Sequence, residues 1–202
     1  MKYLVCGYKR TGKDYLFKMF NNEIDFNWVV YTKPNSDKEF GINDDNRINK
    51  DNRINRVGFA DALREEVNNL YDVRSDEDYD VLKEMVIKDG RTYRDLLIEH
   101  AAFRRNQNID YWISLASKDI ISKNDVMITD WRYPNEVDYL LNLDLKITTI
   151  RVFRSEVPIP PVEMISEHQL DDIVTDFLLV PENEFNKACE IFPQYKSYVR
   201  LN

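Results

Sequence analysis

The segment that most constrains the fold of this chain is Gly7-Tyr8-Lys9-Arg10-Thr11-Gly12-Lys13-Asp14, which directly follows the apolar residues 3–6. Two glycines at this spacing let the backbone curl until consecutive N–H groups point at an anion. Lys13 can then reach the outer phosphates, and the next helix presents its positive end. The segment predicts a strand, a phosphate-binding loop and a helix. The alternative is an ordinary strand-to-helix turn.

Composition narrows the class of protein. With 202 residues, 43% of them hydrophobic, we expect residues 1–202 to form a single compact domain. A net charge of −8 argues against a nonspecific nucleic-acid binder, because such a protein needs a broad basic surface. Cys6 and Cys189 allow neither a disulfide framework nor a zinc pattern. Because no apolar stretch approaches about 18 residues and the first residues lack a signal-peptide pattern, we expect a cytoplasmic protein that binds neither nucleic acid nor membrane.

Hydrophobic patterning predicts an α/β fold, because short apolar runs alternate with longer amphipathic segments, as in parallel strands joined by helices. We expect five strands, at Lys2–Cys6, Val57–Ala60, Val126–Thr129, Thr148–Phe153 and Phe177–Val180. We expect helices from the loop to about Phe20, and at Asp61–Leu70, Arg91–Phe103, Asp110–Ile121 and Asn183–Tyr198.

The polar segment 35–56 is different in kind. It is rich in asparagine and contains the near-duplicates Asn46–Asn49 and Asn52–Asn55. We interpret it as an expanded surface loop. A basic nucleic-acid finger is the alternative, but interleaved aspartates cancel much of its positive charge.

A second irregular segment, 155–168, contains Pro158, Pro160 and Pro161. Three prolines exclude a regular helix or a central strand. Because this segment follows the fourth expected strand, it is either a plain connector or a lid that closes over a site.

Asp130 and Arg132 follow the expected strand Val126–Thr129. An acid at the carboxyl end of a parallel strand lies beside the phosphate loop, because ligands of such sheets bind where the strand ends face a crevice. Asp130 is suited to organise magnesium or a substrate hydroxyl, and Arg132 to grip a phosphate through its planar fork. The alternative for Asp130 is a simple helix cap.

Several blocks in this order resemble the P-loop deoxynucleoside monophosphate kinases of phages and related viruses. The loop 7–14 resembles that family's loop, including Asp in its last position, and Phe59-Ala60-Asp61-Ala62-Leu63-Arg64 is similar to its second-strand exit. Asp130-Trp131-Arg132-Tyr133-Pro134-Asn135-Glu136 resembles its third-strand motif. Arg94 to Trp112 and Ser166 to Asp171 are weaker matches.

The resemblance implies an ATP- and Mg²⁺-dependent kinase that phosphorylates a deoxynucleoside monophosphate, on a three-layer α/β fold with a five-stranded parallel sheet and a lid. The implied ATP contacts are Gly7, Tyr8, Lys9, Arg10, Thr11, Gly12, Lys13, Asp14, Tyr15 and Arg154. The candidate substrate contacts are Asp61, Arg64, Arg94, Arg105, Trp112, Asp130 and Arg132. Lys13, Asp130 and Arg132 are the candidate catalytic residues. The expected partner is a small-molecule nucleotide, and a homodimer is an open alternative. If the protein is viral, we expect it in the host cytoplasm.

Departures from the family pattern leave alternatives open. Asp14 stands where Ser or Thr usually ligates magnesium, so we expect it to meet the ion directly or through water. Tyr15, Ile98 and Ala101 also replace typical residues, which leaves base recognition undetermined. Animal-type phosphomevalonate kinases share part of the pattern and are the runner-up. A nucleotide-binding regulatory module without turnover is the third hypothesis.

Overall fold

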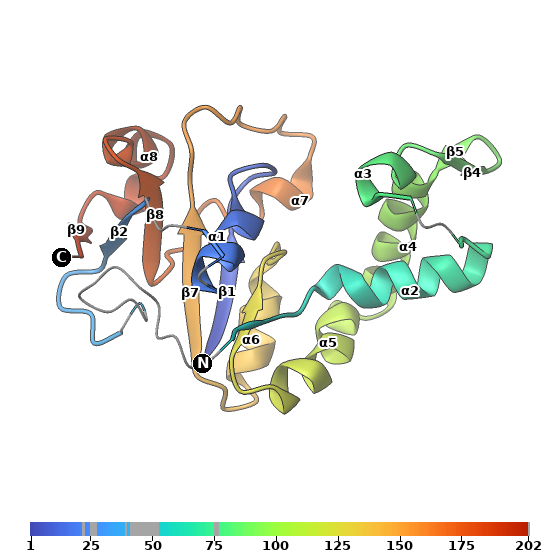
Figure 1. Cartoon of the computed structure of the whole chain (residues 1–202), viewed down its shortest axis with the longest axis horizontal. Helices are drawn as coiled ribbons and strands as arrows, with labels where there is room; N and C mark the ends of the chain where they lie inside the picture. Colours follow the sequence, from blue (N-terminus) through green and yellow to red (C-terminus); the bar gives the residue numbers. More distant parts are fainter. Residues whose placement is uncertain (22, 25–27, 39, 41–52, 75–76, 202) are drawn as a thin grey trace. The chain divides into compact units, whose positions relative to one another are not determined.

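The computed structural model describes residues 1–21, 23–24, 28–38, 40, 53–74 and 77–201. It is an α/β structure with a mostly parallel central sheet of seven strands (Figure 1). The chain divides into two compact units. Unit 1 comprises Met1–Val57 and Ile120–Asn202, and unit 2 comprises Gly58–Asp119. The single domain that we expect from the chain length remains a prediction.

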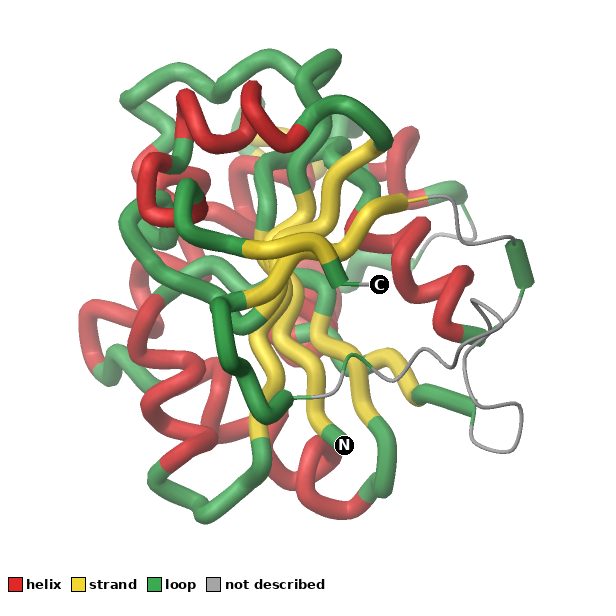
Figure 2. The backbone as a smooth tube through the Cα atoms, turned by 90° about the vertical axis from the view of Figure 1, so that its left-hand side faces the viewer, coloured by secondary structure: helices red, strands yellow, loops and turns green. Residues whose placement is uncertain are grey.

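The sheet of unit 1 has the strand order β3-β6-β1-β7-β8-β2-β9. Its strands are β1 (Lys2–Cys6), β2 (Trp28–Thr32), β3 (Asn55–Arg56), β6 (Val126–Ile128), β7 (Ile147–Val152), β8 (Phe177–Pro181) and β9 (Val199–Arg200). The strands β3, β6, β1, β7 and β8 are mutually parallel. The strand β2 pairs antiparallel with β8, and β9 pairs antiparallel with β2. Figure 2 shows these strands side by side with a continuous twist.

Four of the five expected strands are confirmed, with ends that agree within one residue. The expected strand at Val57–Ala60 is wrong, because the fifth parallel strand is β3 and a helix already begins at Phe59. The Asp61 carboxylate accepts a hydrogen bond from the Gly58 N–H at 2.9 Å, which starts that helix. The strands β2 and β9 are additional to the expected five.

Helices lie on both faces of the sheet in unit 1. They are α1 (Lys13–Phe20), α6 (Pro134–Leu141), α7 (Ile165–His168), α8 (Phe185–Ile191) and the 3₁₀ helix η1 (Pro193–Tyr195). β8 shows the layering, because Phe177 and Leu179 pack into one core cluster with α1 while Leu178 and Val180 pack into another with α8. The expected helix at Asn183–Tyr198 is therefore correct in place but broken, because Pro193 cannot continue a helix.

Unit 2 is helical, with one small hairpin. It contains α2 (Phe59–Tyr71), α3 (Tyr79–Leu82), β4 (Val86–Lys88), β5 (Arg91–Thr92), α4 (Tyr93–Gln107) and most of α5 (Tyr111–Ser122). Its core consists of Val67, Leu82, Tyr93, Leu96 and Leu97. The three helices expected here are present with shifted ends, since Thr92 and Asp95 form a capping box that starts α4 after the hairpin.

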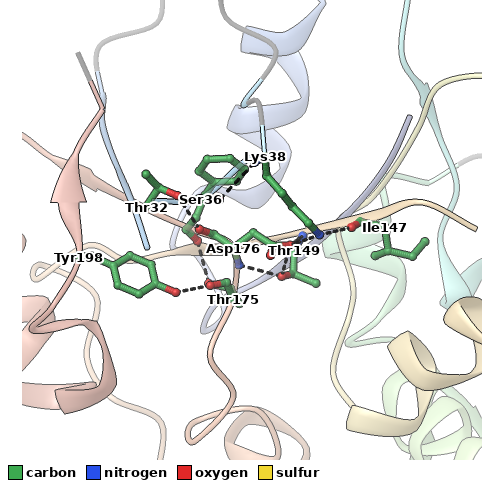
Figure 3. A network of polar contacts seen from close by, with 9 residues as sticks. Thr32, Ser36, Lys38, Ile147, Thr149, Thr175, Asp176 and Tyr198 are labelled. Atoms are coloured by element: carbon green, nitrogen blue, oxygen red, sulfur yellow. Dashed lines mark hydrogen bonds and ion pairs between the residues drawn. The ribbon is translucent and has the colours of Figure 1, made fainter. Parts of the chain in front are cut away.

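Figure 3 shows the polar network that fixes the segment after β2 to the sheet. The Asp176 carboxylate accepts hydrogen bonds from the backbone N–H and the hydroxyl of Thr149, each at 2.8 Å. Lys38 Nζ lies 3.0 Å from the same carboxylate and donates to the carbonyl of Ile147 at 2.7 Å. Lys38 is thereby anchored beside β7.

The segment 35–56 is also anchored where the chain returns to the sheet. Ile54 is buried, and its N–H donates to the Asn21 side chain at 3.0 Å. Residues 39 and 41–52 lie outside the described residues, and with them most of the expected surface loop and its nucleic-acid alternative. None of the helices in the described part of the chain combines the length and apolar character needed to cross a bilayer.

Candidate functional site

A pocket opens in unit 1 where the parallel strands end. It is lined by Cys6, Gly7, Lys13, Asp130, Trp131, Arg132, Arg151, Ser166, Glu167 and Leu170. These residues come from the ends of β1 and β6, from β7, from the start of α1 and from α7 with the residues after it. The structure thus brings together four predicted residues, Gly7, Lys13, Asp130 and Arg132. Parallel topology explains this, since the carboxyl ends of such strands share one edge.

Both glycines of the loop are required by its geometry. Gly7 has φ 140°, and a Cβ there would lie 2.4 Å from the carbonyl oxygen of Val152. Gly12 has φ 102°, and a Cβ there would lie 2.8 Å from the Trp28 ring. The buried Thr11 hydroxyl donates to the Tyr8 carbonyl at 2.9 Å and braces the turn. Any larger residue at either glycine would have to displace backbone or a packed ring.

Lys13 folds back over its own loop. Its Nζ donates to the carbonyl oxygens of Gly7 at 2.6 Å and Tyr8 at 2.8 Å. Burial lowers the pKa of Lys13 from its usual value, and the nearby positive charge of Arg132 lowers it further. An anion in the pocket would oppose both effects, because it favours the charged ammonium group.

Arg132 is held in place through its backbone. The N–H groups of Arg132 and Tyr133 donate to the buried Glu136 carboxylate at 3.0 and 3.1 Å. This contact starts α6 and leaves the Arg132 side chain directed to the pocket, where Asp130 is also part of the lining.

Glu167 of α7 contributes a carboxylate to this pocket. One oxygen, Oε1, accepts from Arg132 Nη1 at 2.5 Å, and the other, Oε2, accepts from the Lys9 backbone N–H at 3.1 Å. The side chain is only 11% exposed. A backbone amide of the loop 7–14 and a guanidinium thus hold an anionic group, and donors of these two kinds also suit a phosphate.

Arg151 places a third positive charge at the pocket. It is 1% exposed, its Nε donates to the Tyr195 hydroxyl at 2.9 Å, and another nitrogen donates to the Leu170 carbonyl. Its guanidinium lies 4.3 Å from the Phe192 ring centroid. Among the described side chains, no carboxylate forms an ion pair with it. The negative charge of Asp171 acts on Arg151 without a direct ion pair, and this buried positive charge would also favour a bound anion.

Asp171 ties the loop to the residues after α7. It accepts from the Tyr8 hydroxyl at 3.0 Å and lies 2.7 Å from His168 Nδ1. The hydrogen bond to Asp171 raises the pKa of His168. The other Asp171 oxygen, Oδ1, is buried without a hydrogen-bond partner.

Asp14, the predicted magnesium ligand, stands at the start of α1. Its carboxylate is 74% exposed, lies 3.2 Å from Arg56 Nη2 and accepts from the Thr129 hydroxyl at 3.2 Å. Within the described ranges, no group of three or more His, Cys, Asp or Glu side chains is arranged to hold a metal ion. The role of Asp14 toward magnesium stays a prediction.

Of the predicted ATP contacts, Gly7 and Lys13 line the pocket and the others do not, among them Tyr15 and Arg154. Tyr15 stacks on Trp28 with ring centroids 5.8 Å apart. Arg154 pairs with Glu156 at 3.0 Å, at the start of the proline-rich segment. That segment is irregular as expected until α7 begins, and the carbonyl of Pro160 lies 3.0 Å from His168 Nε2. The lid and connector interpretations both remain open.

The five remaining substrate candidates, Asp61, Arg64, Arg94, Arg105 and Trp112, belong to unit 2. Asp61 pairs with Arg64 at 2.9 Å, and the Arg64 guanidinium lies over the Tyr79 ring. Trp112 is 4% exposed and belongs to the interior of its unit. Their roles toward a substrate remain predictions.

The remaining two arginines of this set have contacts within unit 2. Arg94 Nη1 lies 4.0 Å from Glu84, and Arg105 donates to the Ile109 carbonyl at 3.4 Å.

Three residues of the site were not among the predicted site residues. Arg151 lies inside an apolar strand, and Thr129 follows one, so neither gives a motif. Glu167 belongs to the block Ser166–Asp171, whose family resemblance is the only signal that could have indicated it.

No model of a known protein family matches this sequence, and no curated protein matches it. Assignment of a function therefore depends on the residues of the pocket itself.

Proposed function

We propose that this chain is a phosphotransferase that moves the γ-phosphoryl group of ATP to a (deoxy)nucleoside monophosphate, on a P-loop kinase fold. One observation carries the proposal. Lys13 and Arg132 line the same pocket, and Arg132 together with the Lys9 N–H holds the carboxylate of Glu167 there. Phosphoryl transfer depends mostly on positioning and charge stabilisation, and these groups supply both.

The proposal gives each residue a role. The backbone N–H groups of residues 8–13 would hold the donor phosphates, and Lys13 would neutralise the outer ones. Arg132 would grip the acceptor phosphate or the group in transfer, because its fork matches phosphate oxygens. Asp130 would orient the acceptor side of the pocket.

Magnesium belongs to this proposal as an ion that arrives with ATP. When bound, it neutralises phosphate oxygens during transfer. Asp14 would hold it, alone or through water. The Arg56 and Thr129 contacts keep the Asp14 carboxylate at the start of α1, so this residue needs no long rearrangement to serve.

A regulatory module that binds nucleotide without turnover is the second candidate. Two observations favour it: Asp14 is already paired with Arg56, and Arg132 with Glu167. A module of this kind would keep both pairs and release no ADP. An animal-type phosphomevalonate kinase activity would use the same pocket and differs only in its acceptor.

One assay separates these candidates. ADP formation from ATP and Mg²⁺ is measured against dAMP, dGMP, dTMP, dCMP, their ribose forms and mevalonate 5-phosphate. The proposal expects acceptor-dependent ADP with at least one nucleotide. ADP formed only with mevalonate 5-phosphate supports the runner-up, and ATP binding with no ADP above the acceptor-free rate supports the regulatory module.

A further inference from the structure

The carboxylate of Glu167 occupies the part of the pocket where positive groups converge. Lys13, Arg132 and Arg151 all line this pocket, and Glu167 bridges Arg132 and the Lys9 N–H. Each of these two donors points at an oxygen of the same carboxylate. The chain therefore supplies its own anion to a site that is built for one.

The geometry points to Glu167 as an internal occupant of a phosphate subsite formed by the Lys9 N–H and Arg132 Nη1, which a substrate phosphate must displace. Displacement releases the Glu167 side chain from the loop. The identity of the displacing anion as a nucleotide phosphate rests on the proposed function.

Displacement follows from charge and from the number of donors. The Lys9 amide has a single hydrogen, and it is used by Glu167 Oε2. A phosphate at the same place would bring a second anion against the carboxylate, which is unfavourable in a partly buried pocket. Glu167 and a phosphate are therefore alternatives at this subsite, and the bound phosphate excludes the carboxylate.

The other attachment of this segment does not compete with an anion. Asp171 lies four residues after Glu167 and contacts the Tyr8 hydroxyl, which is a side chain and not a loop amide. It also keeps His168 close, at 2.7 Å. Release of the Glu167 side chain can thus occur while Asp171 stays bound and His168 keeps its contact with the Pro160 carbonyl.

The test measures binding of tripolyphosphate by calorimetry at constant ionic strength. Glu167→Gln keeps the shape of the side chain and removes its charge, and Glu163→Gln removes one charge from an exposed position of the same segment. Because the wild-type carboxylate must leave first, we expect Glu167→Gln to bind about five- to tenfold tighter than wild type, with Glu163→Gln within about twofold.

Three results would overturn the inference. They are equal affinity of the two variants, weaker binding by Glu167→Gln, and no tripolyphosphate binding by any of the three proteins. Weaker binding would mean that Glu167 orients Arg132 for the anion instead of competing with it. Circular dichroism and thermal melting establish that both variants are folded.

Failure of this inference differs from failure of the proposed function. If wild type forms acceptor-dependent ADP but Glu167→Gln binds tripolyphosphate no tighter than Glu163→Gln, only the displacement is wrong. If the affinities separate as expected but no acceptor supports ADP formation, the subsite stands and the kinase activity does not.

Discussion

Lys13 Nζ lies 2.6 Å from the carbonyl oxygen of Gly7, so the lysine near the end of the loop 7–14 is hydrogen-bonded to the residue that opens the same loop. A substrate phosphate would draw this ammonium group away from the carbonyl, because a charged acceptor makes the stronger hydrogen bond. The lysine is thus positioned for the pocket but contributes few contacts to the core.

The first prediction follows from that position. Lys13→Ala should lower turnover by about 10² to 10⁴ and leave the circular dichroism spectrum unchanged, because the lost group acts on charge in transfer. Lys18→Ala removes the same charge from an exposed position on α1 and serves as the control. Equal activity of the two variants would mean that the loop is not the donor site.

The second prediction concerns the pH dependence of stability. Asp171 raises the pKa of His168 above its ordinary value of 6.5, so the charged form is favoured in the folded protein. The resulting stabilisation is fully present below pH 6.5 and is lost as the pH rises through the folded-state pKa. The free energy of unfolding should therefore separate wild type from His168→Gln more at pH 6 than at pH 9, as measured by urea titration. A separation that is the same at both pH values contradicts it.

The third prediction concerns the polar centre of unit 2. Glu66 accepts from Arg104 Nε at 3.0 Å, lies 2.7 Å from His100 Nε2 and also accepts from the Tyr111 hydroxyl. Burial alone would raise the pKa of Glu66, but these three hydrogen bonds hold it below its usual value. Glu66→Ala should destabilise the protein by about 1–3 kcal/mol in urea unfolding, because it leaves three donors without their acceptor.

The neighbouring Glu65→Ala is the matched control, since Glu65 is exposed on the same helix. We expect it to change the free energy of unfolding by less than about 0.5 kcal/mol. If both variants unfold at the same urea concentration, the cluster adds nothing to stability.

The fourth prediction uses the anchors of the segment 35–56. Replacing residues 41–52 by a short Gly/Ser linker should leave Tm and turnover nearly unchanged, because Lys38 and Ile54 keep their contacts with the sheet. Replacing 37–54 removes both anchors and should lower Tm clearly. A rise in the KM of the acceptor with the shorter replacement would instead assign the segment to the substrate site.

Local sequence patterns were enough to predict the loop and the strands that carry the pocket. The glycine spacing of the loop and the apolar runs of β1, β6, β7 and β8 depend on residues close in the sequence. β2 was missed because it pairs antiparallel with β8, which lies far along the chain, so the local alternation of strands and helices does not indicate it. The strand at Val57–Ala60 was misplaced because the capping contact between Gly58 and Asp61 starts a helix there.

The contacts that complete the pocket join residues far apart in the sequence, which a single sequence does not reveal. Glu167 reaches back to Lys9, and Arg151 acts from inside a buried strand. Long-range pairs of this kind depend on the order of the strands in the sheet, which was not predicted.

The most direct test of the central claim is transfer of ³²P from γ-labelled ATP to a deoxynucleoside monophosphate by wild type and by Arg132→Lys. The account predicts labelled diphosphate with wild type and a steep loss with Arg132→Lys, which keeps the charge but loses the two-pronged contact. Bound ATP with no labelled product from any acceptor, and no effect of Arg132→Lys, would contradict the kinase account.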